Sequence, residues 1–396
     1  MDQEMTSYNW DMLEPEAAVE ALQTIICTAL HSACPAVTKK RQRTSKRQWY
    51  PELAEAVKES KRKLFAWKKA GKPKGDHPTW LEKKRATRRV RTVQRRKAAE
   101  SRRKLLEEIS SATENDTQLA HKLIKKQQRQ DGVTTCLQLD DRTITENGEI
   151  KNAWASYFEE LATARTYEEE LFELDLMRKL VGRKEDDSVF SIQCLNEAIQ
   201  SLKSNKAMDL QGHFAELLKL FSPTARQTLL LIFNKILENG KVPDALKRAY
   251  KIVLPKPGKD HKNMDNYRGI TIASILLKLL ERVWTLSGNE EKINKNINDL
   301  QCGFTSNRSP SMATLLITEN IANARALKSP LYIISLDARK AFDVVDQFLL
   351  RKKLMSTDIS SSMWRLVDDL YVNTTECIKW KDDYSRSYEV RRGVKQ

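Results

Sequence analysis

The stretch Leu331-Tyr-Ile-Ile-Ser-Leu-Asp-Ala-Arg-Lys-Ala-Phe-Asp-Val-Val-Asp346 is the most informative part of this sequence. Its mostly apolar beginning, 331–336, predicts a buried strand. Asp337 follows at the end of that strand, and Phe342 and Asp343 come shortly after it. A carboxylate fixed at the tip of a buried strand is a natural ligand for a hard divalent cation. Because many domains end strands in aspartate, the meaning of this pattern depends on the sequence around it.

Several other short motifs occur before and after this stretch in a defined order. They are Ile252–Lys259, Asn266–Ile272, Leu279–Glu281, Gln301–Thr305 and Arg308–Pro310 upstream, and Arg392–Gln396 at the end of the sequence. The ordered set resembles the reverse transcriptase domain of non-LTR (LINE-type, jockey-like) retrotransposons, over about 191–396. The resemblance implies an RNA-directed DNA polymerase with an RNA template, a DNA primer and deoxynucleoside triphosphates as partners.

The resemblance also assigns roles to individual residues of the predicted strand and the segment after it. Asp337 is implied as the first of three metal-binding, catalytic aspartates, and Ala338 as the donor of a backbone carbonyl to Mg²⁺. Phe342 is implied to lie against the sugar of the incoming nucleotide, where its ring excludes a 2′-hydroxyl. The plainer alternatives are that Asp337 only ends a strand and that Phe342 only fills the core. Asp343 is interpreted as a structural hydrogen-bond partner.

Three more residues are implied to contact the nucleotide. Lys256 and Arg268 correspond to the side chains that surround the triphosphate, since Arg binds phosphate oxygens in pairs and Lys supplies a compact charge. Lys259 and Lys262 are rivals for the role of Lys256, and any of the three could be an ordinary surface lysine. Gln396 corresponds to a glutamine near the deoxyribose.

Two features of the sequence depart from the family. The family has an Ala/Met-Asp-Asp hairpin, which supplies two more aspartates, and an upstream endonuclease. Neither has a counterpart in these 396 residues. The Asp-Asp pairs 140–141, 186–187, 368–369 and 382–383 stand in the wrong order or context to replace that hairpin. The segment Lys206–His213 has Asp209 and Gln211 where the family has glycine and aspartate. We therefore expect a catalytically incompetent fragment of a decayed element copy, because one carboxylate is too little charge for two Mg²⁺ ions.

Charge is concentrated in one part of the chain. The 396 residues have a net charge of +16, and 39–104 contain 26 Lys/Arg and 6 Asp/Glu, so this segment has a net charge of 26 − 6 = +20. A concentrated positive charge predicts a polyanionic partner, here RNA or DNA phosphates. Two highly charged, solvated helices are the plainer alternative. Lys39–Lys46 is also a candidate nuclear import signal.

Composition predicts an intracellular protein of the nucleus, the cytoplasm or both. There is no apolar run of membrane-spanning length and no secretory signal pattern. Six cysteines are scattered without metal-ligand spacing, which indicates a reduced compartment and no structural zinc.

The periodicity of apolar residues predicts helices and short strands, and the resemblance implies an α+β protein in five segments. They are an amphipathic helix in 1–38, a basic helical hairpin in 39–116, a mixed helical connector in 117–190, the fingers region in 191–330 and an incomplete palm in 331–396. In the hairpin, helices 51–69 and 79–109, the second capped by Thr79, would pack Leu53, Val57, Leu64 and Phe65 against Trp80, Val90, Val93 and Leu105. Other expected elements are helices around 153–161, 195–202, 229–237, 274–284, 348–355 and 362–371, and strands at 250–254, 374–380 and 385–391.

Three functional hypotheses follow from the sequence. The first is an inactive fragment of a LINE-type polymerase, and the second is a nucleic-acid-binding module without catalysis. The third is a polymerase subunit that receives its missing aspartates from another chain. The incomplete palm would leave a strand edge and apolar surface uncovered, so we expect the C-terminal third to be marginally stable in isolation.

Overall fold

The computed structural model describes residues 2–33, 50–116, 119, 123–124, 136–139, 142–164, 167–182 and 188–395. Gln396, the linker 39–48, the import-signal candidate and the Asp-Asp pairs 140–141 and 186–187 therefore lie outside the described residues. The chain divides into two compact units, Met1–Pro35 with Thr134–Gln396 and Ala36–Val133. Each unit is described by itself, and helices combined with small sheets make this an α+β protein, as predicted.

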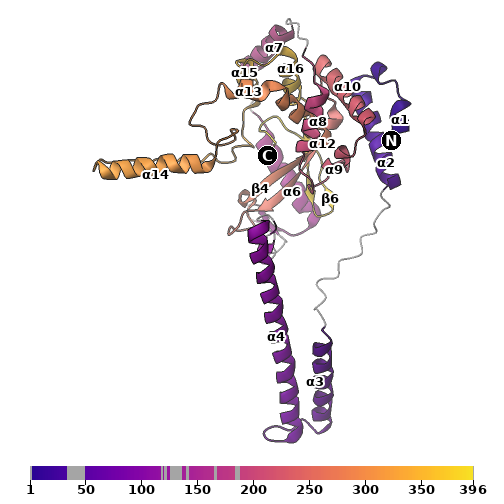
Figure 1. Ribbon diagram of the computed structural model, residues 1–396, viewed down its shortest axis with the longest axis vertical. Coiled ribbons are helices and arrows are strands. Elements are labelled where there is room, and N and C mark those ends of the chain that lie inside the picture. Colours follow the sequence, from indigo (N-terminus) through magenta and orange to yellow (C-terminus); the bar gives the residue numbers. More distant parts are fainter. Residues whose placement is uncertain are drawn as a thin grey trace. The chain divides into compact units, whose positions relative to one another are not determined.

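The second unit contains a helical hairpin of α3 (Pro51–Lys69) and α4 (Pro78–Asn115), shown in Figure 1. Both helices start with proline at the first helical position, where the missing N–H costs nothing and the fixed φ suits the helix. For this reason α4 begins one residue earlier than Thr79, and His77 is the N-cap in its place. The turn between the helices contains Gly71 and Gly75, both with positive φ.

Ion pairs and small apolar residues hold α3 and α4 together in antiparallel register. Ala56, Ala86 and Val93 are buried between the helices. Lys63 pairs with Glu82 and Arg89 with Glu59, each at 2.8 Å, and Arg96 pairs with Glu52. The predicted inward position of Phe65 is wrong, because the side chain is 71% exposed. Phe65 lies nine residues after Ala56, which places it on the opposite side of the helix.

The first unit begins with two short helical elements and one long helix rather than with the single helix predicted for 1–38. These are α1 (Asp2–Thr6), the 3₁₀ helix η1 (Trp10–Met12) and α2 (Pro15–Ala33). The chain breaks here because Pro15 lacks the N–H that a continuous helix needs. The predicted apolar stripe of α2 is confirmed, since Ala18, Leu22 and Ile26 are fully buried.

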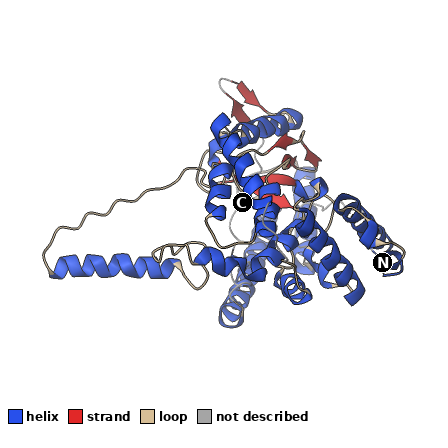
Figure 2. Ribbon diagram, turned by 90° about the horizontal axis from the view of Figure 1, so that it is seen from above, coloured by secondary structure: helices blue, strands red, loops and turns tan. Residues whose placement is uncertain are grey.

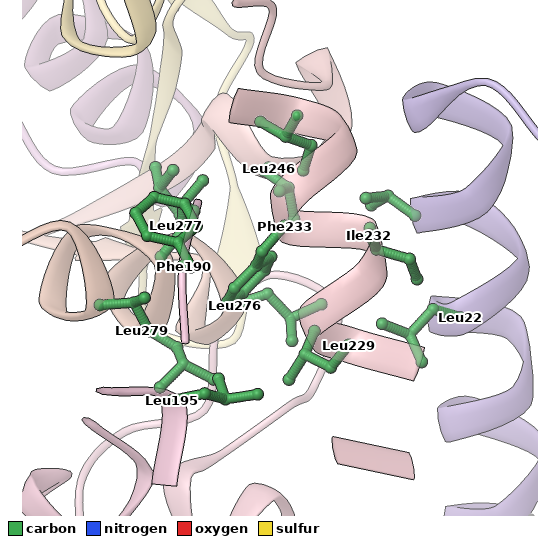
Figure 3. Close-up of a cluster of buried hydrophobic side chains, with 14 of the residues drawn as sticks. Leu22, Phe190, Leu195, Leu229, Ile232, Phe233, Leu246, Leu276, Leu277 and Leu279 are labelled. Carbon is green, nitrogen blue, oxygen red and sulfur yellow. The ribbon is translucent and has the colours of Figure 1, made fainter. Parts of the chain in front are cut away.

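The largest core of the first unit lies between helices. It joins α2 to α8 (Ile192–Ser201), α10 (Pro223–Asn239) and α12 (Ile275–Trp284). Leu22 approaches Leu229 and Ile232, while Phe233 points toward Leu276 (Figure 3). The sequence predicted α8, α10 and α12, including the stop of α10 at Gly240, which adopts the left-handed conformation.

A sheet with strand order β4-β3-β5-β6, in which β7 also pairs with β5, forms the second part of the first unit. Its strands are β3 (Arg248–Pro255), β4 (Tyr267–Ala273), β5 (Thr375–Trp380), β6 (Asp383–Tyr384) and β7 (Tyr388–Glu389). β3 runs antiparallel to β4 and parallel to β5. Helix α6 (Asn147–Ala162) packs against the sheet through Trp154 and Phe158. Of the strand predicted at 385–391 only β7 forms, whereas β6 lies before that range.

The remaining helices cover this framework. They are α7 (Glu168–Gly182), α9 (Ala215–Lys219), α11 (Asp244–Lys247), η2 (Met264–Asn266), η3 (Thr285–Asn289), α13 (Glu290–Asn294), α15 (Gln347–Met355) and α16 (Ser361–Asp369). A two-stranded ribbon joins β1 (Leu137–Leu139) to β2 (Arg142–Ile144). None of the described helices combines the length and the apolar character needed to cross a bilayer.

The strand predicted at 331–336 does not form, and this is the main correction to the sequence analysis. Residues 331–338 have no regular secondary structure and are exposed. The preceding helix α14 (Pro310–Ala326) has no buried residue and extends away from its unit, and the chain returns from it as a long loop (Figure 2). A strand needs a neighbour for its backbone hydrogen bonds, and no described strand pairs with this segment.

Candidate active site

The β3–β4 hairpin positions both predicted triphosphate-binding residues at its end. Leu254 pairs with Arg268 in the antiparallel register, and the backbone N–H of Lys256 donates to the Asn266 carbonyl at 2.8 Å. Nζ of Lys256 donates to the carbonyl of Asp265 at 2.9 Å, whereas Arg268 is exposed. Lys259 and Lys262 are also exposed in the connecting loop.

Asp265 connects this hairpin to the segment that follows Asp337. Its carboxylate accepts a hydrogen bond from the Tyr157 hydroxyl at 2.7 Å, lies 2.9 Å from Nζ of Lys340 and also pairs with Arg339. Nζ of Lys340 lies 4.6 Å from the centroid of the Tyr157 ring. Asp265 therefore holds together a helix, a hairpin loop and the 337–346 segment.

This contact shifts the pKa values of Asp265 and Tyr157 in opposite directions. The hydrogen bonds from Tyr157 and Lys340 lower the pKa of Asp265 to about 2. Burial and the Asp265 carboxylate raise the pKa of Tyr157. Both groups thus keep one protonation state across the neutral range, and the Asp265 carboxylate remains available to its two cationic partners.

Asp337 and Ala338 are exposed directly before this contact. Arg339 and Lys340 tie the chain to Asp265, so Asp337 lies in sequence next to the residues that hold the hairpin. Among the described residues no three Asp, Glu, His or Cys side chains form a group suited to a metal ion. Mg²⁺ binding by Asp337 stays a prediction.

Phe342 is half-buried and packs edge-on against Phe304, with 5.8 Å between the ring centroids. Phe304 is itself 95% exposed. The adjacent Asp343 approaches buried Lys251, with 3.7 Å between Oδ1 and Nζ. Phe342 is therefore not part of a closed core, and the interactions of Asp343 agree with a structural role.

The closing segment 392–395 packs directly on the 342–347 segment. The N–H groups of Gly393 and Val394 donate to the carbonyls of Val345 and Phe342, each at 2.8 Å, and Gln347 donates to the Gly393 carbonyl at 3.1 Å. Gly393 has a φ of +86°, and a Cβ there would lie 2.7 Å from the Asp343 carbonyl oxygen. Only glycine fits this position. The close packing places residues 392–395 of the predicted final motif against the segment that contains Phe342.

A buried polar network lies beneath these segments. Glu376 accepts hydrogen bonds from Thr271 at 3.0 Å and Tyr388 at 3.2 Å. Its carboxylate also forms an ion pair with Nζ of Lys251 at 3.0 Å. The Lys251 Nζ also lies 4.6 Å from the centroid of the Phe158 ring. Sequence analysis did not identify this network, because its members come from β3, β4, β5, β7 and α6.

A cavity of about 190 Å³ adjoins the network and is lined by residues including Glu281, Tyr371 and Lys395. Burial raises the pKa of Glu281 and lowers the pKa of Lys395, while the opposite charges of the two groups partly offset these shifts. The cavity thus contains ionisable groups of both signs.

The loop that departs from the family pattern is nevertheless ordered. Asp209 is buried and its carboxylate accepts hydrogen bonds from the N–H groups of Gln211, His213 and Ile275, at 3.1, 2.8 and 3.0 Å. Gln211 donates to the Ala245 carbonyl at 3.2 Å. Asp209 therefore gives the loop an anchor of its own, which the sequence comparison with the family did not suggest.

The two described Asp-Asp pairs take part in ion pairs. Asp368 pairs with Arg178 at 2.7 Å and Arg351 at 2.9 Å, and Asp369 pairs with Lys247 at 2.8 Å. Asp383 follows the turn at Lys381 and pairs with Lys151.

Comparison with known proteins identifies relatives, although no family model matches the chain. The retrovirus-related Pol polyprotein of the type-1 retrotransposable element R2 from Popillia japonica is 30% identical over 158 residues, 40% of this chain and 22% of that protein. An uncharacterised 149 kDa protein of transposon TX1 from Xenopus laevis is 24% identical over 325 residues, 80% of this chain and 24% of that protein.

A third relative is an RNA-directed DNA polymerase of the mobile element jockey from Drosophila funebris, 31% identical over 115 residues, 29% of this chain and 13% of that protein. The chain thus matches a quarter or less of the length of these three relatives. The resemblance recognised from the motifs is confirmed, since parts of the chain are similar to RNA-directed DNA polymerases of non-LTR retrotransposons, jockey among them.

Proposed function

We propose that this chain is part of a retrotransposon RNA-directed DNA polymerase, in which the β3–β4 hairpin and the 337–346 segment bind the incoming deoxynucleotide. The observation that supports the proposal best is the contact of Asp265 with Lys340 at 2.9 Å and with Arg339. It holds the segment with Asp337 and Phe342 to the hairpin with Lys256 and Arg268. The reverse-transcriptase arrangement of fingers and palm is part of the same proposal.

Each side chain has a distinct task in the proposed site. Exposed Arg268 is free to bind phosphate oxygens in pairs, while Lys256 contributes charge at the base of the hairpin. Phe342 offers one ring face near the sugar and is supported on its edge by Phe304. Gln396 and the Ala338 carbonyl remain proposed contacts of the deoxyribose and the metal.

Mg²⁺ held by Asp337 would supply the metal chemistry of such a site. For the 396-residue chain on its own we expect no primer extension, since one carboxylate gives too little charge for a pair of divalent ions. An RNA template with an annealed DNA primer and labelled deoxynucleotides tests this expectation directly. Extension by the isolated chain would contradict it.

Nucleotide binding tests the proposal without requiring catalysis. We expect the chain to bind a deoxynucleoside triphosphate more tightly than the matching ribonucleotide, measured by isothermal titration calorimetry. Arg268→Ala should weaken the binding of both about tenfold, which corresponds to the ~1.5 kcal/mol of a charge-assisted contact. Phe342→Ala should reduce the preference between them. Arg325→Ala, which removes an exposed arginine of α14, is the matched control. Equal effects of the two arginine variants would reject the assignment.

A nucleic-acid-binding module without catalysis is the second candidate function. It is favoured by the basic hairpin α3–α4, within a segment of net charge 26 − 6 = +20 at 39–104. Salt-dependent binding of RNA or DNA by a chain that neither binds nucleotides nor extends primers would support this candidate over the first.

A further inference from the structure

A single row of cations follows the outer face of α4. Lys84, Arg88, Arg91, Arg95 and Arg102, here called the α4 stripe, are spaced by four, three, four and seven residues. At 100° per residue these spacings keep all five on one face. That face is opposite to Ala86 and Val93, which are buried against α3. The stripe therefore faces away from the partner helix.

The stripe differs from the inner-facing arginines of α4 in its lack of ion-pair partners. All five side chains are exposed, and among the residues that the structure describes none forms an ion pair with them. By contrast, Arg89 and Arg96 on the inner side pair with Glu59 and Glu52 of α3. Charge on the inner side is thus neutralised within the hairpin, whereas charge on the stripe is left for an external anion.

The stripe is also straight and rigidly supported. From Lys84 to Arg102 it spans 18 residues, about 27 Å of helix at 1.5 Å per residue. The helix below it is held by the ion pairs to α3 and by Lys83, whose Nζ lies 3.6 Å from the Trp67 ring centroid and 4.5 Å from that of Trp80. Cations thus recur every one to two turns, and from Lys84 to Arg95 the helix beneath them is paired with α3.

We propose that the α4 stripe binds the phosphate backbone of a nucleic-acid duplex. A rigid row of cations suits phosphates that a duplex already holds in place, because neither partner loses much freedom on binding. Single strands are typically bound by aromatic rings that stack on the bases, and the stripe contains no aromatic residue. A membrane surface would require apolar side chains beside the cations, and the stripe itself contains none. The inference rests on the proposed nucleic-acid function and specifies its ligand and its surface.

The opposite side of the hairpin has a second basic surface, which is an alternative binding site and also a matched control. Lys58, Lys61, Arg62, Lys68 and Lys69, here called the α3 face, are also exposed and surround the exposed ring of Phe65. This combination of cations with an aromatic ring suits a single strand. Changing either set of five to glutamine removes the same charge. The two variants therefore separate the effect of where the charge lies from the effect of net charge.

The test is a salt titration of binding by the full 396-residue chain to an RNA duplex, a DNA duplex and a single RNA strand. For wild type the slope of log K against log salt should be about −4 to −5 on duplexes, from five phosphates at ~0.9 each. The five-fold α4 variant should lose most of this slope and at least about tenfold in duplex affinity, while the α3 variant keeps both within about threefold. Circular dichroism of both variants checks that the helices remain.

The possible outcomes lead to different conclusions. Equal losses in the two variants, or a wild-type preference for the single strand, would overturn the stripe proposal while leaving nucleic-acid binding intact. Absence of binding to every nucleic acid would reject the binding function itself. Binding of anionic phosphatidylserine vesicles in place of duplexes would assign the stripe to a membrane surface and overturn the proposal as well.

Discussion

Among single residues, Asp265 has a lowered pKa that makes its contribution to stability depend on pH. Its folded pKa of about 2 is lower than the ~3.9 of an unfolded aspartate. A carboxylate with a lowered pKa stabilises the fold fully above the unfolded pKa, and this contribution is lost as pH falls through the folded pKa. The contribution of Asp265 should therefore be constant between pH 5 and 7 and disappear between about pH 4 and 2.

We predict that Asp265→Asn lowers the free energy of unfolding by about 1 kcal/mol at pH 7. This is a low value for charge-assisted hydrogen bonds, because the side chain is 40% exposed. Urea denaturation from pH 3 to 7 measures the effect, and the difference from wild type should shrink only at the acidic end. Asp358→Asn, at an exposed position, is the control. A difference that grows as pH falls would contradict the predicted sign.

Glu376 supports a second prediction, because it is 3% exposed and bonded to Lys251 at 3.0 Å. Glu376→Gln should destabilise the protein by about 3 kcal/mol, since it leaves a buried ammonium with a weaker partner. Adding Lys251→Met should recover part of that loss, because the unpaired charge is then gone. A double-mutant cycle by urea denaturation tests this, and strictly additive losses would show that the two residues do not interact.

At the level of secondary-structure elements, the closing segment depends on one glycine. Both Gly393 and Gly288 have φ near +86°, but a Cβ at Gly288 meets nothing within 4 Å, whereas at Gly393 it meets backbone at 2.7 Å. Gly288→Ala should therefore cost about 1 kcal/mol from backbone strain alone. Gly393→Ala should lower the free energy of unfolding by clearly more. It should also expose the backbone amides at positions 393 and 394 to hydrogen exchange. Equal effects of the two variants would show that segment 392–395 is not packed on 342–347.

The segment 331–336 shows why some elements could not be predicted from the sequence. The helices α8, α10 and α12 follow from local periodicity, caps and breakers, and the sequence identified all three. A strand, however, exists only through its neighbour, and no described strand borders 331–336. The role of Asp265 was missed for a similar reason, since its bond to Arg339 joins residues 74 positions apart.

In the whole molecule, the exposed apolar segment should affect association more than folding. Tyr332, Ile334 and Leu336 are at least 85% exposed. We predict that Ile334→Ser with Leu336→Ser changes the free energy of unfolding by less than about 0.5 kcal/mol, as expected for surface positions. The same change should reduce binding of the dye ANS and self-association. A loss of stability above about 1.5 kcal/mol would show that the segment is buried in solution.

The division into two units leads to a prediction for unfolding as a whole. The hairpin and the first unit have separate cores, and the 331–336 segment adds no core to the C-terminal third. We expect urea to unfold the chain in more than one step, measured by circular dichroism together with tryptophan fluorescence. One cooperative transition with both probes would contradict this expectation and the predicted marginal stability of the C-terminal third.

The most direct test is to map where a photoreactive deoxynucleoside triphosphate crosslinks to the 396-residue chain, using mass spectrometry. If the hairpin and the segment after Asp337 form one nucleotide site, labelled peptides should come from 256–268 and 337–346, and unlabelled deoxynucleotide should compete. Arg268→Ala should reduce both labels together. Labelling confined to the basic hairpin 51–115, or to neither segment, would contradict the proposed site.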